Sequence, residues 1–461
     1  MRRTAIGILI GLGWVGVGRT APVPAVAAGY VEEALTRNLA LAGRALEVER
    51  AQSRLAEVRG ALQPRLDLVA RYSRADGGRT IGFPAGDLLN GAYRTLNDFL
   101  RAQGQPAAFP QIENQSIPLL RDREQETKLR LTQPLYRPEI TRGARASRAN
   151  VATQEALLAA YKRELRLTVL TAYYGYLQAE SAVRILESAG ALTAEALRVN
   201  RQLREAGKIT DDRVLRAEAE ELVVRQQRTE AESDRNAARR GFNFLLNRDL
   251  EAPITPPVAE ELATITNRLL TEPLSEARGV EQREEWIARQ SALAATVASE
   301  DAARSKLYPT LALAVEGGVQ GAEYRTGRGA NFVQGSVVAE INLWDGRQQR
   351  GQLTQARLDR RQAELDLEQT RLQLVLQLTR ATDELRAAAG GYQAAEARRT
   401  ALARAFEIIA GREREGVASQ LSFIDARNEL TRAELNAEIL RQRLFTAAAE
   451  LDRAAALTPL P

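Results

Sequence analysis

The sequence contains no cysteine and no histidine, and it has a single methionine among 461 residues. Without these side chains the chain cannot form disulfides, thiol nucleophiles, Ser-His-Asp triads or the common zinc sites. We therefore expect no enzymatic activity, no metal site and no cofactor. A lipid anchor on a cysteine that follows a signal sequence is not expected either.

Long apolar runs are also missing. Beyond residue 28 the chain has no stretch of roughly 18 or more apolar residues, so no transmembrane helix is predicted. The N-terminus instead shows Arg2 and Arg3, an apolar run over 5–17 and small residues over 25–28. This layout predicts a signal peptide over 1–28, cleaved after Ala27 or Ala28, with an uncleaved anchor as the alternative.

The charge is nearly balanced once this segment is set aside. The first 28 residues hold three arginines and no acid, which leaves 61 basic and 59 acidic residues and a net charge of +2. Because no long run of one sign occurs, nucleic acid is not the expected partner. An exported chain of this kind is soluble and periplasmic, secreted, or an outer-membrane β-protein.

Three landmarks occur twice in the same order, which predicts a tandem duplication of roughly 200 residues. The paired stretches are GALQPRLDLVARYS (60–73) with SKLYPTLALAVEGG (305–318), QPLYRPEITRGA (133–144) with INLWDGRQQRGQ (341–352), and EAGKITDDRVLRA (205–217) with REGVASQLSFIDA (414–426). The third pair is offset by 209 residues. We assign the first repeat to 29–247, the second to 279–461, and a partly structured, proline-containing linker or equatorial region to 248–278.

Each repeat carries two stretches in which apolar residues alternate with polar ones. This period of two predicts strands over 65–75 and 127–136 in the first repeat, and over 309–319 and 333–343 in the second. The strands enclose a long loop, 76–126, with a short helix near 87–102, and a short loop, 320–332.

Long helical hairpins follow each strand pair. Leu358, Leu365 and Leu372 recur every seven residues, and the series Leu430, Ala433, Ala437, Leu440, Leu444, Ala447 and Leu451 steps by three and four, as in coiled coils. We predict helices of roughly 100 Å. Gly190 and Gly390-Gly391 are alternative positions for a break, but we expect the hairpins not to turn there.

The hairpins are predicted to turn near 207 and 416. Gly207 and Gly416 suit the left-handed residue at a helix C-terminus, and Thr210 and Ser419 suit the N-cap of the returning helix. Four strands cannot close a barrel, and edges in a membrane must be paired, so we expect three copies to share twelve strands around a hollow axis.

The P-x-L-x-L strand starts, the LWDGRQQRG turn and the G-x-x-[ST]-x-x-x-[VF]-[LI]-x-A tips resemble the TolC-type outer-membrane efflux protein family over about 30–458. The resemblance implies a mainly α fold with a small β part, in which a trimer forms a 12-stranded transmembrane barrel and a helical tunnel in the periplasm. It also implies an exit duct for efflux or type I secretion, with a periplasmic adaptor and an inner-membrane RND, ABC or MFS pump as partners. The chain departs from the family at Arg137-Pro138-Glu139, where an Asp-Gly-type turn is usual, and in the length of the 76–126 loop.

The resemblance also implies site residues at the tips. Asp425 occupies the position of a pore-facing acid, Ser422 lies one turn earlier, and Asp212 and Arg213 fall where a Thr-Asp pair is common, with Asp211 beside them. A ring of carboxylates at a narrow opening concentrates cations and repels anions. Asp211 and Asp212 could instead only stabilise the N-terminus of the returning helix.

The residues implied to contact the adaptor are those of the two turns: Gly207, Lys208, Thr210, Gly416 and Ser419.

Two other classes of protein carry coiled-coil hairpins, namely periplasmic adaptors and elongated coiled-coil surface proteins. An adaptor has one hairpin inserted into a small β-domain, whereas this sequence has two hairpins, each preceded by a strand pair. This difference favours the channel.

Overall fold

The computed structural model describes residues 21–272, 280–415 and 417–460 and separates into two compact units. The helical unit comprises residues up to Arg54, Ala146–Val297 and Arg357–Pro461, and the sheet unit comprises Leu55–Arg145 and Ala298–Ala356. Most of the predicted signal peptide, 1–28, lies outside the described residues. Helix α1 (Ala25–Arg37) begins just ahead of the predicted cleavage site, and Ala27 is buried.

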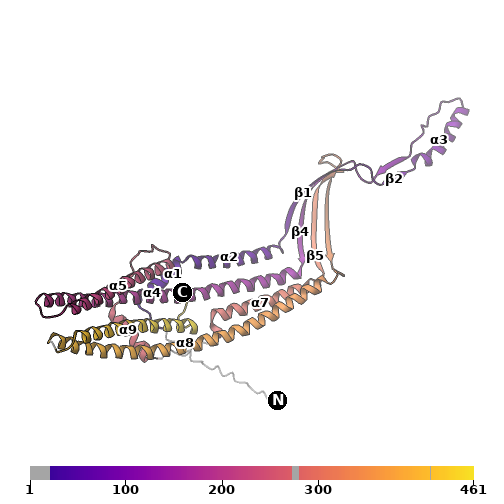
Figure 1. The fold of residues 1–461 in the computed structure, drawn as a ribbon. Helices are drawn as coiled ribbons and strands as arrows, with labels where there is room; N and C mark the ends of the chain where they lie inside the picture. The colour runs from indigo at the N-terminus through magenta and orange to yellow at the C-terminus, as the bar shows by residue number, and fades with distance from the viewer. Residues whose placement is uncertain (1–20, 273–279, 416, 461) are drawn as a thin grey trace, which may run out of the picture. The chain divides into compact units, whose positions relative to one another are not determined.

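Helices make up most of the described chain, which confirms the mainly α fold class with a small sheet. Besides α1 they are α2 (Leu39–Gly60), α3 (Ala85–Ala102), α4 (Pro138–Glu205), α5 (Asp211–Leu245), α6 (Ala259–Thr271), the short 3-10 helix η1 (Val280–Gln282), α7 (Glu284–Ser305), α8 (Gln348–Arg414) and α9 (Gln420–Ala455). Helix α4 lies beside α5, and α8 beside α9, as two hairpins (Figure 1).

Helices α4 and α8 contain 68 and 67 residues and continue through Gly190 and Gly390-Gly391. Neither helix has a proline beyond its first position, and Pro138 at the start of α4 is tolerated because that residue needs no N–H partner. A lone glycine inside a helix costs only about 1 kcal/mol relative to alanine, which side-chain packing offsets.

The buried seam of α8 differs from the predicted one. Leu358, Leu365 and Leu372 are 64%, 53% and 62% exposed, whereas the buried heptad positions are Leu374, Ala381, Ala388 and Ala395. Helix α9 has only 36 residues and returns along the tip-proximal half of α8, so it does not reach the earlier leucines. They lie on a face of α8 that the described residues leave exposed. In α9 the predicted seam is largely buried, at Ala433, Ala437, Leu444, Ala447 and Leu451.

The sheet unit contains a four-stranded antiparallel sheet in the order β1-β4-β5-β6. The strands are β1 (Arg65–Arg74), β4 (Arg123–Tyr136), β5 (Thr310–Gly321) and β6 (Asn331–Glu340). Strands β1, β4 and β5 lie side by side in Figure 1. Strand β6 ends three residues before the predicted boundary at 343, and β4 begins four residues before the predicted 127. The loop between β1 and β4 contains α3 and a two-stranded ribbon of β2 (Thr80–Phe83) and β3 (Gln115–Pro118).

The two faces of the sheet differ in chemistry. On one face the paired residues of the four strands are mostly aliphatic, and many are exposed: Leu66, Leu68, Tyr72, Leu129, Leu131, Leu313, Val315, Val333 and Val337. The opposite face carries an ion network in which Lys128 Nζ lies 2.8 Å from Glu126 and 2.7 Å from Glu316. Arg130 also pairs with Glu316. An exposed apolar face on a sheet is unusual in a water-soluble monomer.

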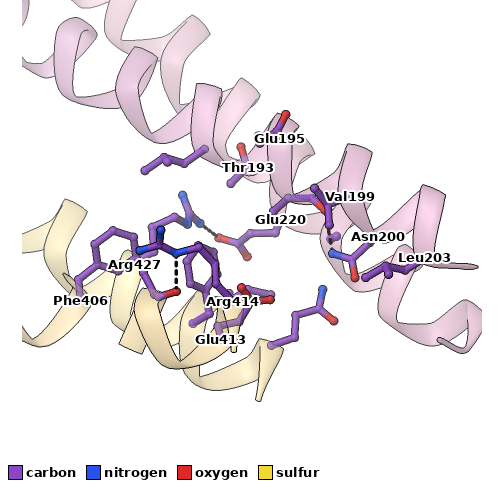
Figure 2. Close-up of a pocket in the computed structure, with 17 residues that line it drawn as sticks. Thr193, Glu195, Val199, Asn200, Leu203, Glu220, Phe406, Glu413, Arg414 and Arg427 are labelled. Atoms are coloured by element: carbon purple, nitrogen blue, oxygen red, sulfur yellow. Dashed lines mark hydrogen bonds and ion pairs between the residues drawn. The ribbon is translucent and has the colours of Figure 1, made fainter. Parts of the chain in front are cut away.

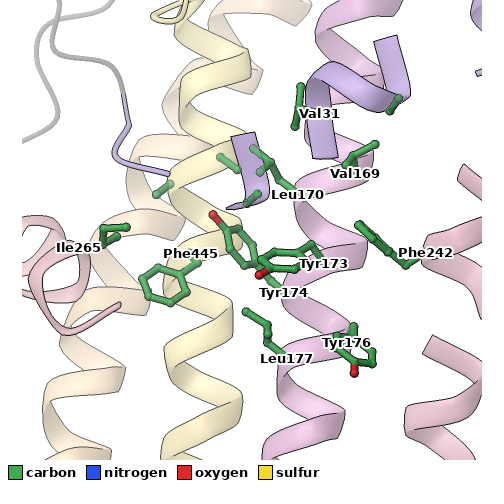
Figure 3. Close-up of a cluster of buried hydrophobic side chains, with 14 of the residues drawn as sticks. Val31, Val169, Leu170, Tyr173, Tyr174, Tyr176, Leu177, Phe242, Ile265 and Phe445 are labelled. Atoms are coloured by element: carbon green, nitrogen blue, oxygen red, sulfur yellow. The ribbon is translucent and has the colours of Figure 1, made fainter. Parts of the chain in front are cut away.

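The core of the helical unit gathers aromatic residues from several helices (Figure 3). The Tyr30 ring packs against Tyr173 of α4 and Phe242 of α5, with ring centroids 5.6 and 5.0 Å apart. The Tyr173 hydroxyl donates to the Thr255 carbonyl at 2.9 Å, and the Thr255 N–H donates to the Tyr30 hydroxyl at 2.8 Å. Ile265 of α6 is buried in the same cluster. The described part of the predicted linker 248–278 is therefore an element of the core.

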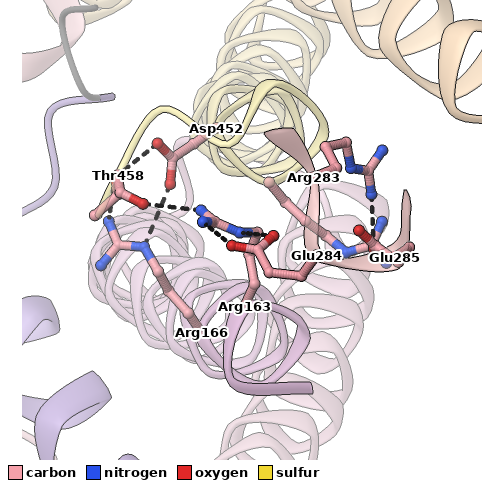
Figure 4. Close-up of polar contacts among 8 residues, drawn as sticks. Arg163, Arg166, Arg283, Glu284, Glu285, Asp452 and Thr458 are labelled. Carbon is pink, nitrogen blue, oxygen red and sulfur yellow. Dashed lines mark hydrogen bonds and ion pairs between the residues drawn. The ribbon is translucent and has the colours of Figure 1, made fainter. Parts of the chain in front are cut away.

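A buried polar network ties α4, α7 and the C-terminal residues together (Figure 4). Arg163 donates two hydrogen bonds to Glu284, at 2.9 and 2.6 Å, and a third to the Thr458 carbonyl at 2.8 Å. Arg166 donates to Asp452 at 3.3 Å, and the Thr458 hydroxyl donates to Asp452 at 2.7 Å. Bidentate pairing of this kind fixes the distance between the helices that carry the two groups.

Candidate functional site

The first hairpin tip is closed by a glycine in the left-handed region, with φ +71° at Gly207. The N–H of Lys208 donates to the carbonyl of Leu203 at 2.9 Å, and the N–H of Gly207 donates to that of Arg204 at 2.9 Å. These two bonds form a Schellman motif, which satisfies carbonyls at the end of α4. Thr210 stands at the N-cap of α5, but its hydroxyl makes no cap bond and instead donates to the Asp212 carboxylate.

The second tip repeats this backbone pattern 209 residues later. The N–H of Val417 donates to the Arg412 carbonyl at 2.8 Å, at the same offset as Lys208 to Leu203. Gly416, the predicted turn residue, lies outside the described residues. Ser419 caps α9: its hydroxyl oxygen accepts the N–H of Ser422 at 3.1 Å, and the two hydroxyls are 2.8 Å apart.

Near the tips, two hydrogen-bonded contacts join the hairpins. The Gln420 side chain donates to the Arg213 carbonyl at 3.2 Å, next to the turns. Further along, Arg427 of α9 donates to Glu220 of α5 and, at 2.7 Å, to Asn428. Arg427 is only 2% exposed. Its burial lowers the pKa of the guanidinium, while Glu220 acts to raise it.

A cavity of about 440 Å³ lies between the hairpins beside this pair (Figure 2). Phe406 and Phe423 line it, with ring centroids 5.5 Å apart, together with Val199 and Leu203 of α4. Arg427 and Glu220 stand at its wall (Figure 2). Near the tips the two hairpins thus meet through a few polar contacts and a loosely filled apolar space. Their contact there is weaker than in the aromatic core, where the Tyr174 ring of α4 packs on the Phe445 ring of α9.

The acidic candidates lie in different local settings. Asp425 is exposed and, within the described chain, makes no hydrogen bond or ion pair. Asp211 pairs with Arg204 across the first turn. Asp212 accepts the Thr210 hydroxyl, and this hydrogen bond holds the pKa of its carboxyl below the ordinary value. Both residues also occupy the first turn of α5, where an acid stabilises the helix.

The remaining candidates are exposed residues of the tips: Lys208, Arg213 and Ser422. Arg213 contributes its carbonyl, not its guanidinium, to the contact between the hairpins.

The Arg427–Glu220 pair was not predicted from the sequence, because its partners are 207 residues apart and neither stands in a recognisable motif. The one signal for it was that Arg427 falls between Phe423 and Leu430 in the three-four spacing of α9.

The residues that the structure describes include no group of three His, Cys, Asp or Glu side chains that could hold a metal ion. Over the same residues, no helix is both long and apolar enough to cross a membrane. The candidate functional features of the described chain are thus the charged turns and the cavity near the hairpin tips, and the two chemically distinct faces of the sheet.

Comparison with known proteins gives the context for this geometry. Residues 281–457 match the family described as outer membrane efflux protein. The chain matches no curated protein sequence significantly.

Among solved structures, the chain is similar to the Campylobacter jejuni CmeC outer membrane channel, with a TM-score of 0.77 and 15% identity, over 97% of this chain and 90% of that one. A membrane protein from Pseudomonas aeruginosa gives a TM-score of 0.76 at 19% identity, covering 95% and 94% of the two chains. The open state of the Neisseria gonorrhoeae MtrE outer membrane channel gives 0.73 at 18% identity, covering 94% and 89%. Residues 281–457 therefore resemble the outer membrane efflux protein family, and the chain has the fold of these channels over nearly its whole length.

Proposed function

We propose that this protein is the outer-membrane exit duct of an efflux or type I secretion system, a passive conduit across the outer membrane and the periplasm. The observation that carries the proposal is the two-faced sheet. Its exposed aliphatic face suits lipid, and its face with Lys128, Glu126 and Glu316 suits a water-filled lumen. The efflux family match over 281–457 and the channel fold support the same assignment.

Closure of the sheet requires more than one copy. Strands β1 and β6 are the edges of a four-stranded sheet, and an edge in a lipid bilayer would leave its N–H and C=O groups without partners. Pairing β1 of one copy with β6 of the next would give a closed barrel of twelve strands in a trimer. The exposed heptad leucines Leu358, Leu365 and Leu372 offer a second seam for a neighbouring copy.

In this arrangement the hairpin tips face the partners in the periplasm. The exposed turn residues Gly207, Lys208, Thr210 and Ser419, with Gly416, would contact a periplasmic adaptor, which in turn would link the duct to an inner-membrane RND, ABC or MFS pump. A periplasmic adaptor or a structural coiled-coil protein remains the alternative function. Neither alternative requires an exposed apolar sheet face.

The direct test is the mass of the protein extracted from outer membranes in mild detergent, measured by light scattering with the detergent subtracted. We expect three copies of the mature chain in the outer-membrane fraction. A monomer in the soluble periplasmic fraction would overturn the proposal, because the four strands would then form no pore.

We further propose that Asp425 and Asp212 form a cation-attracting ring at the periplasmic opening, with Asp211, Arg213 and Ser422 around them. Asp425 is the stronger candidate because no described side chain neutralises it. Asp212 has a lowered pKa, so it is ionised at neutral pH. Three copies of each carboxylate would give the opening a negative potential.

Replacing both residues, as Asp212→Asn with Asp425→Asn, is expected to lower the preference for cations in planar-bilayer recordings at low salt, where screening is weak. The matched control is Glu47→Gln with Glu368→Gln, which removes the same charge from exposed ion pairs of α2 and α8. Equal selectivity in the double variant and in the control would place the selective constriction elsewhere.

A further inference from the structure

The loop between β1 and β4 folds into a defined module, which we call the loop module (residues 75–122). It consists of the β2–β3 ribbon, helix α3 and a return segment, 103–114, that lies along α3. Asn90 donates to the Ile112 carbonyl at 2.7 Å and accepts the Ile112 N–H at 2.8 Å. Asn97 makes the same pair of bonds with Phe109, at 2.7 and 3.0 Å. These side chains supply the hydrogen bonds that a neighbouring strand would give.

One face of α3 packs against the return segment. A Cβ at Gly86 would lie 2.3 Å from the Ile112 carbonyl oxygen, so only glycine fits there. The Tyr93 ring packs on Phe109 with centroids 5.4 Å apart. The return segment is therefore held against a single face of α3, and the helix has a fixed orientation within the module.

The other face of α3 is apolar and exposed. Leu88, Ala92, Leu96 and Phe99 follow one another at helical spacing, and Leu88 and Phe99 are 67% and 63% exposed. We call these four residues the α3 stripe. A preorganised helix with an uncovered apolar stripe is the form in which helices pack against a partner.

The charge of α3 argues against a lipid surface as the partner of the stripe. Helix α3 carries two acids and two arginines, Asp87, Asp98, Arg94 and Arg101, and therefore no net charge. A helix that lies on an anionic membrane surface is rich in Lys and Arg on its polar face. Helix α3 lacks this excess, and its Arg101 already pairs with Asp98 of the same helix.

The position of the module in the chain favours another copy of this chain as the partner. The module follows β1, the edge strand at which the proposed function brings the next copy of the chain. Resting on that proposed function, we propose that the α3 stripes of three copies pack against one another and form a helical cap at the loop end of the barrel. The partner of the stripe is thus another copy of this chain, not lipid and not a different protein.

Disulfide cross-linking tests the cap with little background, because the chain has no cysteine. Phe99→Cys in the stripe is compared with Arg94→Cys, which lies on the opposite flank of the same helix; both purified proteins are treated with a mild oxidant. We expect disulfide-linked dimers for Phe99→Cys, in at most two of every three chains because three thiols surround one axis. Arg94→Cys should give several-fold less dimer and should react faster with a water-soluble maleimide. Leu88→Cys serves as a second stripe variant if Phe99→Cys assembles poorly.

The light-scattering mass of each sample separates this inference from the proposed function. A sample that is not trimeric contradicts the proposed function itself. A trimer in which the stripe cysteines form no dimers and react with maleimide as fast as Arg94→Cys overturns the cap. A trimer in which they are protected from maleimide but form no dimers also overturns it, since lipid would then cover the stripe.

Discussion

Replacing Glu284 by alanine is expected to destabilise the helical unit by about 3–5 kcal/mol, the usual cost of leaving a buried charge without its partner. Arg163 is 5% exposed, and Glu284 accepts two of the three hydrogen bonds that it donates. After the substitution only the Thr458 carbonyl would remain as an acceptor. The thermal unfolding midpoint of the purified protein measures the loss.

Two further variants give this experiment its controls. Glu368 pairs with Arg371 on the exposed surface of α8, and Glu368→Ala should leave the midpoint nearly unchanged because exposed pairs contribute little. The double variant Arg163→Met with Glu284→Leu should recover much of the stability, since it removes both charges together. Equal midpoints for Glu284→Ala and Glu368→Ala would mean that the buried network does not hold α4 and α7 together.

The same pair sets a dependence on pH. Burial acts to raise the pKa of the Glu284 carboxyl, but the hydrogen bonds and the charge of Arg163 outweigh it and hold this pKa below the ordinary value of 4.5. A carboxyl of this kind contributes its stability above the pKa of the unfolded chain and loses it as the pH falls through the folded value. The difference in midpoint between the wild type and Glu284→Gln should therefore shrink as the pH is lowered below 4.5.

Features that depend on local chemistry could be predicted from the sequence. The turn near 207 follows from Gly207, because few other residues tolerate its positive φ. The same pattern, a glycine followed three residues later by Ser or Thr, predicted the second tip. The continuity of α4 through Gly190 follows from the absence of proline and the regular apolar spacing around it. The alternation of Leu66, Leu68 and Tyr72 marked a strand with one apolar face.

Features that depend on distant partners could not be predicted in this way. Leu358, Leu365 and Leu372 have a heptad spacing, but periodicity does not reveal which face of α8 the rest of the chain covers. The prolines near 253–257 indicated a partly structured linker or equatorial region, but they do not reveal that Thr255 bonds to Tyr30 and Tyr173, residues more than 80 positions away. The Arg427–Glu220 contact has the same origin: only the packing of two hairpins brings these residues together.

Two neighbouring residues of β6 provide the sharpest test of the two-faced sheet. Val337 lies on the apolar face opposite Leu313 and is 63% exposed, while Ser336 lies on the polar face opposite Ala314. In water, Val337→Arg at so exposed a site would cost little, whereas an arginine facing lipid near the bilayer midplane costs about 2–4 kcal/mol for each chain. The Ser336→Arg side chain would extend into the aqueous lumen, where the network around Glu316 already accommodates charge.

We therefore expect Val337→Arg to reduce strongly the amount of trimer recovered from outer membranes, because each of the three chains would place one arginine in lipid. Ser336→Arg should assemble at the wild-type level and change only the conductance. The two substitutions add the same side chain at nearly the same depth, so a difference between them can arise only from the face on which each lies. Equal recovery of both variants would show that the aliphatic face does not contact lipid, and the channel assignment would lose the observation on which it rests.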